Sequence, residues 1–324
     1  MINFAKVSSI GDNKMHSDSR IYVAGHRGLV GSAIVRLLEK KGFNNIIRRT
    51  SSEVDLRDLN AVEIFLQEEK PEYVFLAAAK VGGILANDTY PAEFIHDNLM
   101  IQNNVIHSSW KNGVKKLIFL GSSCIYPKFS QQPMKEEYLM TGELEPTNSP
   151  YAVAKIAGIE MCWAYNRQYG TKFIPVMPTN LYGPNDNYNL YTSHVMPALI
   201  RKFHEALSSG DNEVVMWGTG SPKREFLHVD DLADACFFIM EKDIDMKKPL
   251  FNIGTGKEIS IKDLALLIKG ITGFKGKIVN DTTKPDGTPR KLLDISRMES
   301  LGWKASVSLK DGISDSYHWF LENC

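Results

Sequence analysis

The stretch that decides the fold is Ile21-Tyr22-Val23-Ala24-Gly25-His26-Arg27-Gly28-Leu29-Val30-Gly31. Its first four residues form an apolar run that predicts a short buried strand, and its glycines follow in the order G-x-x-G-x-x-G. Apolar residues then recur with helical spacing up to Lys41, and Gly42 predicts the end of that helix. A glycine turn between a strand and a helix brings backbone amides close to the pyrophosphate of a dinucleotide. The stretch therefore predicts a dinucleotide site, with an ordinary tight turn as the alternative, and its expected cofactor-binding residues are Gly25, Arg27, Gly28, Leu29, Val30 and Gly31.

Further along the chain, short apolar strands alternate with amphipathic helices. The strands expected after the first span residues 45–47, 73–77, 117–120 and 172–177, and the later helices span 60–67, 94–110 and 151–169. Strands that are apolar at every position are typical of a parallel sheet covered on both faces. We therefore expect an α/β protein with a Rossmann-type doubly wound parallel sheet.

The alternation loosens after about residue 178, where a loop rich in proline, glycine and asparagine begins. Shorter elements follow: a helix near 193–207, a strand at 214–216 and a helix at 229–241. We expect a flexible N-terminal arm at 1–19, a dinucleotide-binding domain at 20–178 that recruits some later elements, and a smaller α/β part at 179–324 that mainly binds substrate.

The composition is that of an ordinary globular protein, with 43% apolar and 23% charged residues, and argues against disorder or a coiled coil. Lys plus Arg and Asp plus Glu both number 38, so the formal net charge is zero and nothing global favours nucleic acid or an anionic membrane. No apolar run approaches the roughly 20 residues that a membrane span needs. The four cysteines lie far apart and the eight histidines show no ligand spacing, so we expect no disulfide scaffold, no metal site and a cytoplasmic location.

The residues after the second expected strand indicate which dinucleotide binds. An Asp or Glu usually holds the ribose 2′-hydroxyl of NAD about 20 residues beyond the glycines. Here that place holds Arg48-Arg49-Thr50, and the guanidinium groups of Arg27 and Arg49 match a 2′-phosphate. NADP(H) is therefore favoured; the alternative is a solvated basic edge, and Glu53 nearby argues for NAD. Other residues expected along the cofactor are Asp55 at the adenine and, at the end of the third strand, Ala77 and Ala78.

Tyr151 and Lys155 share one face of a helix because they are four residues apart. A phenol titrates near 10 in water, and we expect the lysine ammonium, together with a cationic nicotinamide, to lower that pKa toward the range of acid–base catalysis. Upstream, Ser122 closes an apolar strand, where its hydroxyl could bond a substrate carbonyl. The pair alone is common on helices, so its weight comes from its combination with the glycine turn.

The whole set resembles the extended short-chain dehydrogenase/reductase family, which acts largely on nucleotide sugars. Longer stretches resemble one group of that family, the GDP-L-fucose synthases, over about residues 21–323: AAKVGGI at 78–84, GSSCIYP at 121–127, MPTNLYGP at 177–184, REFLHVDD at 224–231 and KPDGTPRK at 284–291. The resemblance implies epimerisation at C3 and C5 of GDP-4-keto-6-deoxy-D-mannose, followed by NADPH-dependent reduction of the C4 ketone to give GDP-L-fucose. It also implies a homodimer joined through two helices of the dinucleotide domain.

The resemblance assigns roles at matching positions. It makes Ser122, Tyr151 and Lys155 the reductase triad, and Cys124 and His194 the acid–base pair of the epimerisation, without saying which of the two is the base at C3 or at C5. The nicotinamide pocket would be lined by Lys155, Pro178, Thr179, Asn180, Leu181 and His194. The GDP-sugar would contact Lys202, Trp217, Arg224 and Asp286, with Lys291 as a weaker candidate.

Other interpretations stay open at this point. Taken singly, Cys124, His194 and Trp217 are typical of ordinary core or loop positions, and only the joint pattern favours a site. A sister enzyme such as a nucleotide-sugar 4-reductase or 4-epimerase would use the same fold. A non-catalytic NADP(H)-binding regulatory protein is the third alternative, and the intact triad argues against it.

Overall fold

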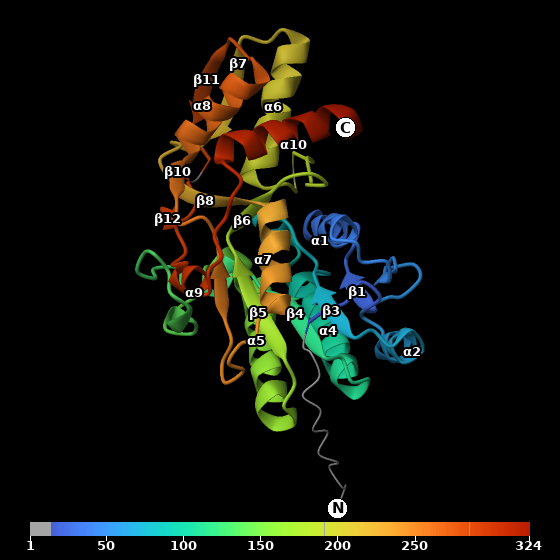
Figure 1. Cartoon of the computed structure of the whole chain (residues 1–324). Coiled ribbons are helices and arrows are strands. Elements are labelled where there is room, and N and C mark those ends of the chain that lie inside the picture. Colours follow the sequence, from blue (N-terminus) through green and yellow to red (C-terminus); the bar gives the residue numbers. More distant parts are fainter. Residues whose placement is uncertain (1–13, 191, 285) are drawn as a thin grey trace, which may run out of the picture.

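The computed structural model describes residues 14–190, 192–284 and 286–324, and its largest element is a parallel sheet of six strands in the order β2-β1-β3-β4-β5-β9 (Figure 1). The chain starts at β1, the second strand from one edge, and then adds β2 on one side and β3 on the other. The strand order therefore changes direction between β1 and β3, which is where doubly wound folds bind ligands. This confirms the predicted fold class. The strands are β1 (Ile21–Ala24), β2 (Ile46–Ile47), β3 (Tyr73–Leu76), β4 (Lys116–Leu120), β5 (Phe173–Pro178) and β9 (Phe251–Ile253).

Helices cover both faces of the sheet because its strands are apolar on both sides. Ile21 and Val23 face a core completed by α1 and α7, whereas Tyr22 and Ala24 face a core completed by α2, α4 and α5. Asp58 begins α2 by accepting the amides of Asn60 and Ala61, which places that helix start one residue before the predicted one. The helices are α1 (Leu29–Lys40), α2 (Leu59–Glu69), α4 (Pro91–Lys111), α5 (Ser149–Tyr169) and α7 (Val229–Glu241).

Two of these elements, β9 and α7, come from beyond residue 178. β9 pairs with β5 at the edge of the sheet, and α7 packs on α1. The buried Lys116 of β4 fastens α7, because its Nζ donates to the carbonyls of Ile239, Met240 and Lys242 at 2.9, 2.8 and 2.6 Å. These are the last carbonyls of the helix, where a cation is favoured. Burial lowers the pKa of Lys116 to about 8.

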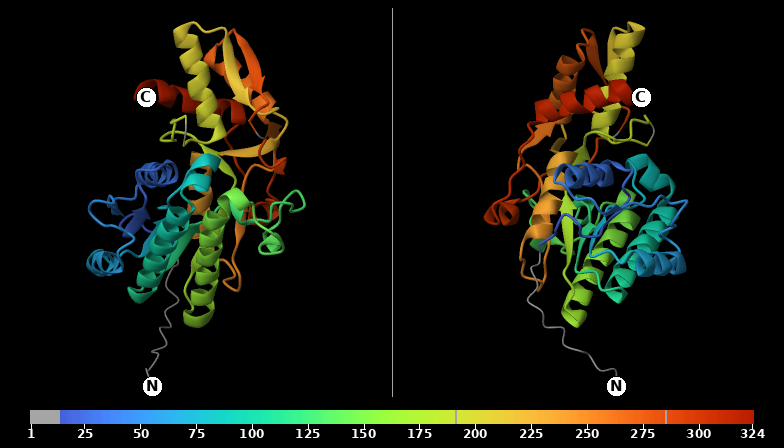
Figure 2. Two further views of the ribbon diagram at one scale, coloured as in Figure 1. Left: turned by 180° about the vertical axis from the view of Figure 1, so that it is seen from behind. Right: turned by 45° about the vertical axis from the view of Figure 1, so that its right-hand side comes forward.

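The second part of the molecule lies above the large sheet in Figure 1 and has its own core. A sheet in the order β10-β8-β12, with β6 also paired to β8, lies between that core and the large sheet, and β7 pairs with β11 farther away (Figure 2). Its strands are β6 (Asn180–Tyr182), β7 (Glu213–Trp217), β8 (Lys223–His228), β10 (Glu258–Ser260), β11 (Lys277–Asp281) and β12 (Arg290–Lys291). Its helices are α6 (Val195–Ser209), α8 (Ile261–Thr272) and α10 (Leu309–Asn323).

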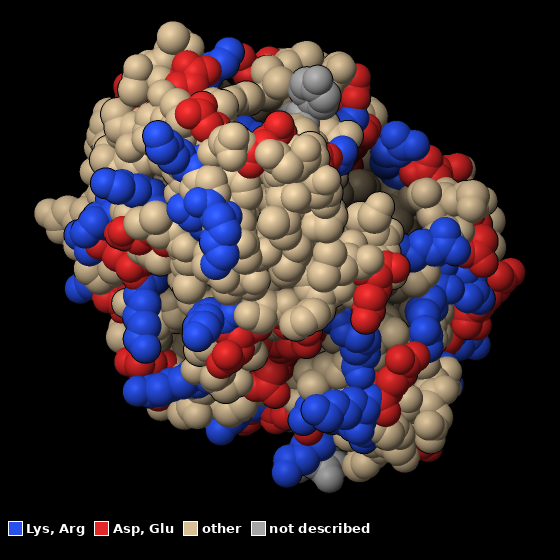
Figure 3. Space-filling model, turned by 90° about the horizontal axis from the view of Figure 1, so that it is seen from above, with Lys and Arg blue, Asp and Glu red and all other residues tan. Residues whose placement is uncertain are grey.

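Short helices complete the chain. They are α3 (Ile84–Thr89), α9 (Ser296–Ser300) and the 3₁₀ helices η1 (Ser123–Ile125), η2 (Glu136–Tyr138) and η3 (Pro146–Asn148). None of the helices in the described ranges is both long and apolar enough to cross a membrane. Seen from above, Lys and Arg side chains alternate with Asp and Glu around uncharged surface, so neither sign dominates this face (Figure 3).

The expected N-terminal arm falls mainly on residues 1–13, which lie outside the described residues. Its last part, from residue 14, packs on the dinucleotide domain. Met15 is buried, and its amide donates to Glu241 at 3.0 Å. Burial of Met15 and this bond hold residue 15 against the domain, while the flexibility expected for 1–19 stays a prediction.

Candidate active site

The glycine turn between β1 and α1 is built for close approach of a ligand to the backbone. Gly25 has φ +82°, a conformation that favours glycine, and its carbonyl accepts the amide of Gly28 at 3.0 Å. A Cβ on Gly25 would lie 2.8 Å from the amide nitrogen of Ala78, so the end of β3 closes directly on the turn. Gly28 is the exposed N-cap of α1 and offers no side-chain cap, which leaves the first amides of the helix for an anion. Next to them, Arg27 is exposed while Leu29 and Val30 pack on the core.

Gly31→Ala is expected to destabilise the protein and to abolish cofactor binding. A Cβ at this position would lie 2.1 Å from the carbonyl oxygen of Gly25, so the turn itself must move. Gly270→Ala, in the last turn of α8 with nothing within 4 Å of the new carbon, is the matched control and should stabilise the protein by up to about 1 kcal/mol. Thermal melting with and without NADP measures both effects. Gly31→Ala protein with the parent's NADP-induced shift in Tm would contradict this account of the turn.

The basic end of β2 holds its arginines in ion pairs with nearby carboxylates. Arg49 pairs with Glu69, and Arg48 pairs with Glu39 at 2.7 Å. Glu53, the residue that argued for NAD, accepts both the amide and the hydroxyl of Thr50 through one oxygen, each at 2.7 Å. These bonds lower the pKa of Glu53, and the charges of Arg49 and Arg27 lower it further. The charges of Arg27 and Arg49 therefore both reach Glu53. The Glu53 carboxylate, which would favour NAD, is held by its two hydrogen bonds from Thr50.

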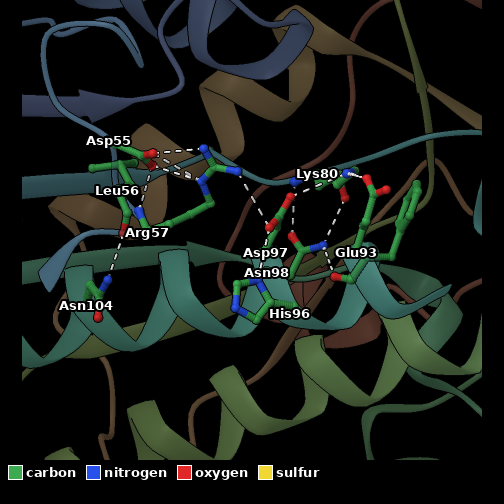
Figure 4. A network of polar contacts seen from close by, with 10 residues as sticks. Asp55, Leu56, Arg57, Lys80, Glu93, His96, Asp97, Asn98 and Asn104 are labelled. Carbon is green, nitrogen blue, oxygen red and sulfur yellow. Dashed lines mark hydrogen bonds and ion pairs between the residues drawn. The ribbon is translucent and has the colours of Figure 1, made fainter. Parts of the chain in front are cut away.

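Asp55 lies at the start of a polar network that runs along the top of α4 (Figure 4). Its oxygens accept from Arg57 Nε and Nη2 at 3.0 and 2.8 Å, which lowers the pKa of Asp55. Arg57 in turn approaches Asp97 at 3.7 Å, and Asp97 also faces Lys80 at 3.4 Å. The network thus joins the expected adenine site to the segment that follows Ala77 and Ala78.

Asn98 in α4 is a residue that the sequence analysis missed. Its side chain brackets Lys80, accepting the Lys80 amide at 3.1 Å and donating to the Lys80 carbonyl at 3.0 Å (Figure 4). The backbone beyond the end of β3, along which the cofactor is expected to lie, is therefore held by a buried side chain. An isolated Asn inside a helical pattern gives no sign of this role.

The predicted triad residues come together where β4 ends and α5 begins. Ser122 caps η1, where its Oγ accepts the Cys124 amide at 3.4 Å, and its hydroxyl is close enough to the Tyr151 phenol and the Cys124 thiol to lower the pKa of both. Lys155, one turn along α5 from Tyr151, is buried, with its Nζ 5.8 Å from the centre of the tyrosine ring. Cys124, placed by the 3₁₀ turn, feels the charges of Lys155 and Lys291. One small volume thus holds the four predicted residues and the weaker candidate Lys291.

The pKa expected for Tyr151 has to be corrected. Burial raises the pKa of Tyr151 above that of free tyrosine, and the hydrogen bond from Ser122 lowers it only in part. The ammonium of Lys155 does not point at the phenol oxygen, because it donates to the Leu120 carbonyl at 2.8 Å. Burial also lowers the pKa of Lys155 to about 8. The protein groups alone therefore favour a neutral phenol, which is a proton donor.

Cys124 and His194 have pKa values that move in opposite directions. Burial raises the pKa of the Cys124 thiol, against the lowering by Ser122 and the two lysines. His194 is the N-cap of α6. Desolvation by the surrounding protein lowers the pKa of its imidazole, although solvent still reaches the side chain. The loop before it is fixed to the β3–α3 connection, because the Gly83 amide donates to the Thr192 carbonyl at 3.1 Å. At neutral pH the pair consists of one protonated group, the thiol, and one unprotonated group, the imidazole.

Cations without carboxylate partners mark the substrate side of the site. Among the ion pairs of the described residues, none involves Lys202, Arg224 or Lys291. Arg224 and Lys291 lie at paired positions of β8 and β12. Burial lowers the pKa of Lys291, and the charge of Arg224 lowers it further. Two adjacent cations of this kind form a site for a diphosphate.

Trp217 offers a flat surface beside these cations. Its ring is 56% exposed, with Lys202 Nζ 5.4 Å and Lys284 Nζ 5.7 Å from its centre. Asp286 fixes the turn that follows Trp217, since it accepts the amide and the hydroxyl of Thr219 at 2.9 and 2.7 Å. An exposed aromatic ring next to an anchored carboxylate suits a purine base that donates hydrogen bonds.

The residues expected to line the nicotinamide pocket form the junction of β5 and β6. Pro178 ends β5, and the Thr179 amide donates to the Ile253 carbonyl at 3.0 Å. The Thr179 hydroxyl and the Asn180 amide group both donate to the Glu225 carbonyl, at 3.2 and 2.8 Å. Leu181 packs on the core under α1 and α7. Among the described residues no group of His, Cys, Asp and Glu is arranged to hold a metal ion.

Comparison with known proteins gives a consistent picture. Residues 21–254 match the model of the NAD dependent epimerase/dehydratase family. A putative GDP-L-fucose synthase 2 of Arabidopsis thaliana is 61% identical over 313 residues, covering 97% of this chain and 95% of that protein. The GDP-L-fucose synthase of Escherichia coli strain K12 is 54% identical over 314 residues, covering 95% of this chain and 98% of that protein.

Two solved structures are similar over nearly the whole chain. A GDP-L-fucose synthetase from Naegleria fowleri bound to NADP has a TM-score of 0.88 at 31% identity, covering 95% of this chain and 94% of that one. A GDP-6-OMe-4-keto-L-xylo-heptose reductase from C. jejuni has a TM-score of 0.90 at 45% identity, covering 96% and 99%. Both structures share the overall fold described above.

Proposed function

The chain belongs to the NAD dependent epimerase/dehydratase family, and from that premise we propose that it converts GDP-4-keto-6-deoxy-D-mannose into GDP-L-fucose by two inversions and one reduction. It is an enzyme that epimerises and reduces a GDP-sugar, and its cofactor is NADP(H). The observation that carries the proposal is the cluster of Ser122, Cys124, Tyr151 and Lys155 around one small volume, next to unpaired cations.

The residues of the glycine turn fit the cofactor. The turn is a cradle that a Cβ at Gly25 or Gly31 would fill, and the uncapped start of α1 supplies amides for the pyrophosphate. Arg27 and Arg49 supply charge for the 2′-phosphate, and Lys155 lies where it can hold the nicotinamide ribose. When bound, the cofactor supplies the hydride for C4.

The epimerisation needs a proton taken from C3 and from C5 on one face of the sugar and a proton returned on the other face. Both carbons flank the C4 ketone, so the negative charge formed by proton removal is delocalised onto its oxygen. Cys124 and His194 start as a thiol and a neutral imidazole, which are one acid and one base. The Ser122 hydroxyl and the Lys291 ammonium lie where they can stabilise the enolate oxygen and a developing thiolate.

The stereochemistry requires that Cys124 and His194 return to their starting protonation states between the two inversions. In the D-manno configuration the hydrogens on C3 and C5 lie on the same face of the ring, so the same residue removes both. Each inversion exchanges the protonation states of the two residues, and a proton must then move before the second inversion begins. His194 is reachable by solvent and can exchange its proton there.

The reduction completes the reaction at C4. The resulting alkoxide takes the Tyr151 proton, which the raised pKa of the phenol keeps in place until that moment. The Ser122 hydroxyl, which lies close to the Tyr151 phenol, can hold the C4 oxygen by a hydrogen bond. Lys155 is buried, so bulk water is kept from the amine beside this proton transfer.

Product analysis tests the proposal. The parent enzyme, given the keto-sugar and NADPH, should consume the cofactor and yield the L-galacto configuration at C3 and C5 by NMR. A second candidate, C4 reduction alone, is favoured by the similarity to the C. jejuni heptose reductase and would leave both centres unchanged. Retention at C3 and C5 would therefore refute the bifunctional assignment.

Arg49→Ala is expected to raise the KM for NADPH by about 10–100-fold, because it removes a charge-assisted hydrogen bond to the 2′-phosphate. The KM for NADH should change little, since that cofactor lacks the phosphate. Arg48→Ala is the matched control, because Arg48 pairs with Glu39 of α1 and is not assigned to the cofactor. An equal rise for the two cofactors would show that Arg49 does not select NADPH.

Quaternary structure and location extend the proposal. α4 and α5 lie side by side on one face of the sheet, and Val153 and Tyr169 of α5 are 42% and 36% exposed, which supports a homodimer formed through these helices (Figure 2). Sedimentation at increasing concentration tests this. The four cysteines are free thiols, which supports a reducing, cytoplasmic location.

A further inference from the structure

Glu225 is a buried carboxylate that none of the roles above uses. It lies in β8, next to Arg224, and is 0% exposed. Its Oε1 accepts the amides of Thr255 and Gly256, both at 2.7 Å, and its Oε2 accepts the amide of Leu293 at 2.9 Å. Within the described part of the chain no lysine or arginine pairs with it, and burial raises its pKa. A buried carboxylate without a cation lowers the stability of the folded protein, so we expect Glu225 to serve a function that offsets this cost.

The bonds of Glu225 join the segments that carry the two ligand sites. Leu293 follows Lys291 by two residues, at the end of the strand that pairs with Arg224. On the other side, the main-chain oxygen of Glu225 accepts from Thr179 and Asn180 of the nicotinamide pocket, at 3.2 and 2.8 Å. One residue therefore contacts the diphosphate side through its side chain and the nicotinamide side through its backbone.

The turn after β9 is shaped around this carboxylate. A Cβ on Gly254 would lie 2.3 Å from Glu225 Oε1, so only glycine leaves room for the side chain there. The amides of Thr255 and Gly256 then close on the same oxygen. Because β9 is the last strand of the large sheet, this turn ties Glu225 to the dinucleotide domain.

We propose that Glu225 is a positioning residue that fixes the diphosphate-binding pair Arg224 and Lys291 relative to the nicotinamide pocket. The identity of the two ligands rests on the proposed function. Side chains alternate along a strand, so Arg224 projects from the opposite face of β8 and Glu225 touches no ligand itself. What Glu225 sets is the separation between the sugar's C4 and the hydride donor, and a shift of about 1 Å in such a separation can cost about 100-fold in rate.

Glu225→Gln tests the proposal at nearly constant volume. The amide oxygen of Gln keeps the bonds to Thr255 and Gly256, but its NH₂ group would face the N–H of Leu293, donor against donor. The substitution therefore releases the segment that carries Lys291. We expect the Kd for GDP, measured by calorimetry on the NADP-loaded protein, to rise about 10-fold, and kcat to fall at least 10-fold with a larger isotope effect from deuterated NADPH. The Kd for NADPH alone should stay within about 3-fold of the parent value.

Glu136→Gln is the matched control. Glu136 is also buried, and it accepts the backbone amide of Asn252 in β9 at 2.9 Å. Among the described residues it has no hydrogen bond to either of the segments that carry the ligand sites. It should lower Tm to a similar extent and leave the GDP affinity unchanged. If Glu225→Gln gives a loss of Tm with parent GDP affinity and parent kcat, Glu225 is merely structural and the proposal is overturned.

Two further measurements keep the outcome decisive. If the parent enzyme does not turn over the keto-sugar, the proposed function fails, while the Kd for GDP in Glu225→Gln still decides the positioning role. If Glu225→Gln does not fold, Gly254→Ala displaces the carboxylate without removing its charge, and the same rise in the Kd for GDP is expected. Parent affinity for GDP in folded Gly254→Ala would overturn the proposal.

Discussion

Tyr151→Phe is expected to lower the rate of NADPH oxidation with the keto-sugar by about 10²–10⁴-fold, the range in which a positioned acid contributes to catalysis. The substitution removes only the hydroxyl and keeps the Tyr151 ring against Phe94, whose ring centre lies 6.2 Å away. The loss of reduced-nicotinamide absorbance measures the rate. The Kd for NADPH should change little, since Lys155 and the glycine turn are untouched.

Tyr165→Phe is the control for this substitution. Tyr165 lies on the same helix, and its hydroxyl bonds His107 at 2.7 Å away from the site. It should oxidise NADPH at the parent rate. Near-parent turnover in Tyr151→Phe would mean that another group protonates the C4 oxygen, and Ser122 would then be the next residue to replace.

Cys124→Ser and His194→Gln are expected to suppress the uptake of solvent deuterium at C3 and C5 by about 100-fold or more, because each removes one member of the acid–base pair. The exchange is followed by NMR in heavy water with the keto-sugar and oxidised NADP, so that no hydride is transferred. Serine is a far weaker acid than a thiol, and glutamine has no group that titrates near neutral pH. Tyr151→Phe should behave in the opposite way: exchange persists and reduction stops.

The neighbouring residues supply controls for these two substitutions. Cys162→Ser replaces another buried thiol on α5, and His204→Gln replaces a histidine of α6 whose ring bonds Tyr317 at 3.1 Å. Both should exchange deuterium at the parent rate. If Cys124→Ser and His194→Gln also exchange at the parent rate, the pair does not carry out the inversions.

The sequence predicts the large sheet well because its strands are apolar at every position. Ile21 to Ala24 and Tyr73 to Leu76 are buried throughout, as a sheet covered on both faces requires. The glycine turn was predictable for a local reason: strand, turn and helix are consecutive, so spacing alone defines the geometry. The same holds for Tyr151 and Lys155, which one helix turn brings onto one face.

The parts that could not be predicted depend on contacts between distant residues. Glu225 stands within a motif that the sequence analysis quoted, yet its amide partners lie 30, 31 and 68 residues away along the chain. The predicted effect of Lys155 on the pKa of Tyr151 was wrong for a similar reason, because spacing indicates that Lys155 is near but not that its ammonium donates to the Leu120 carbonyl. Lys291 was the weaker candidate for substrate binding in the sequence, because its neighbour Cys124 lies in η1, far away along the chain.

The origin of β9 and α7 in the second half of the chain bears on how the protein is made. During synthesis, residues 20–178 leave the ribosome before residue 253 has been added. The emerging chain then contains five strands of the large sheet, and β5 at its edge lacks its partner β9. The apolar face that α7 will cover, which includes Ile118 and Leu120 of β4, is bare over the same interval. Lys116 has no helix end to bind until Lys242 has been added. The large sheet is therefore complete only after residue 253 has been made, and until then its bare face and its unpaired edge are open to association with other chains.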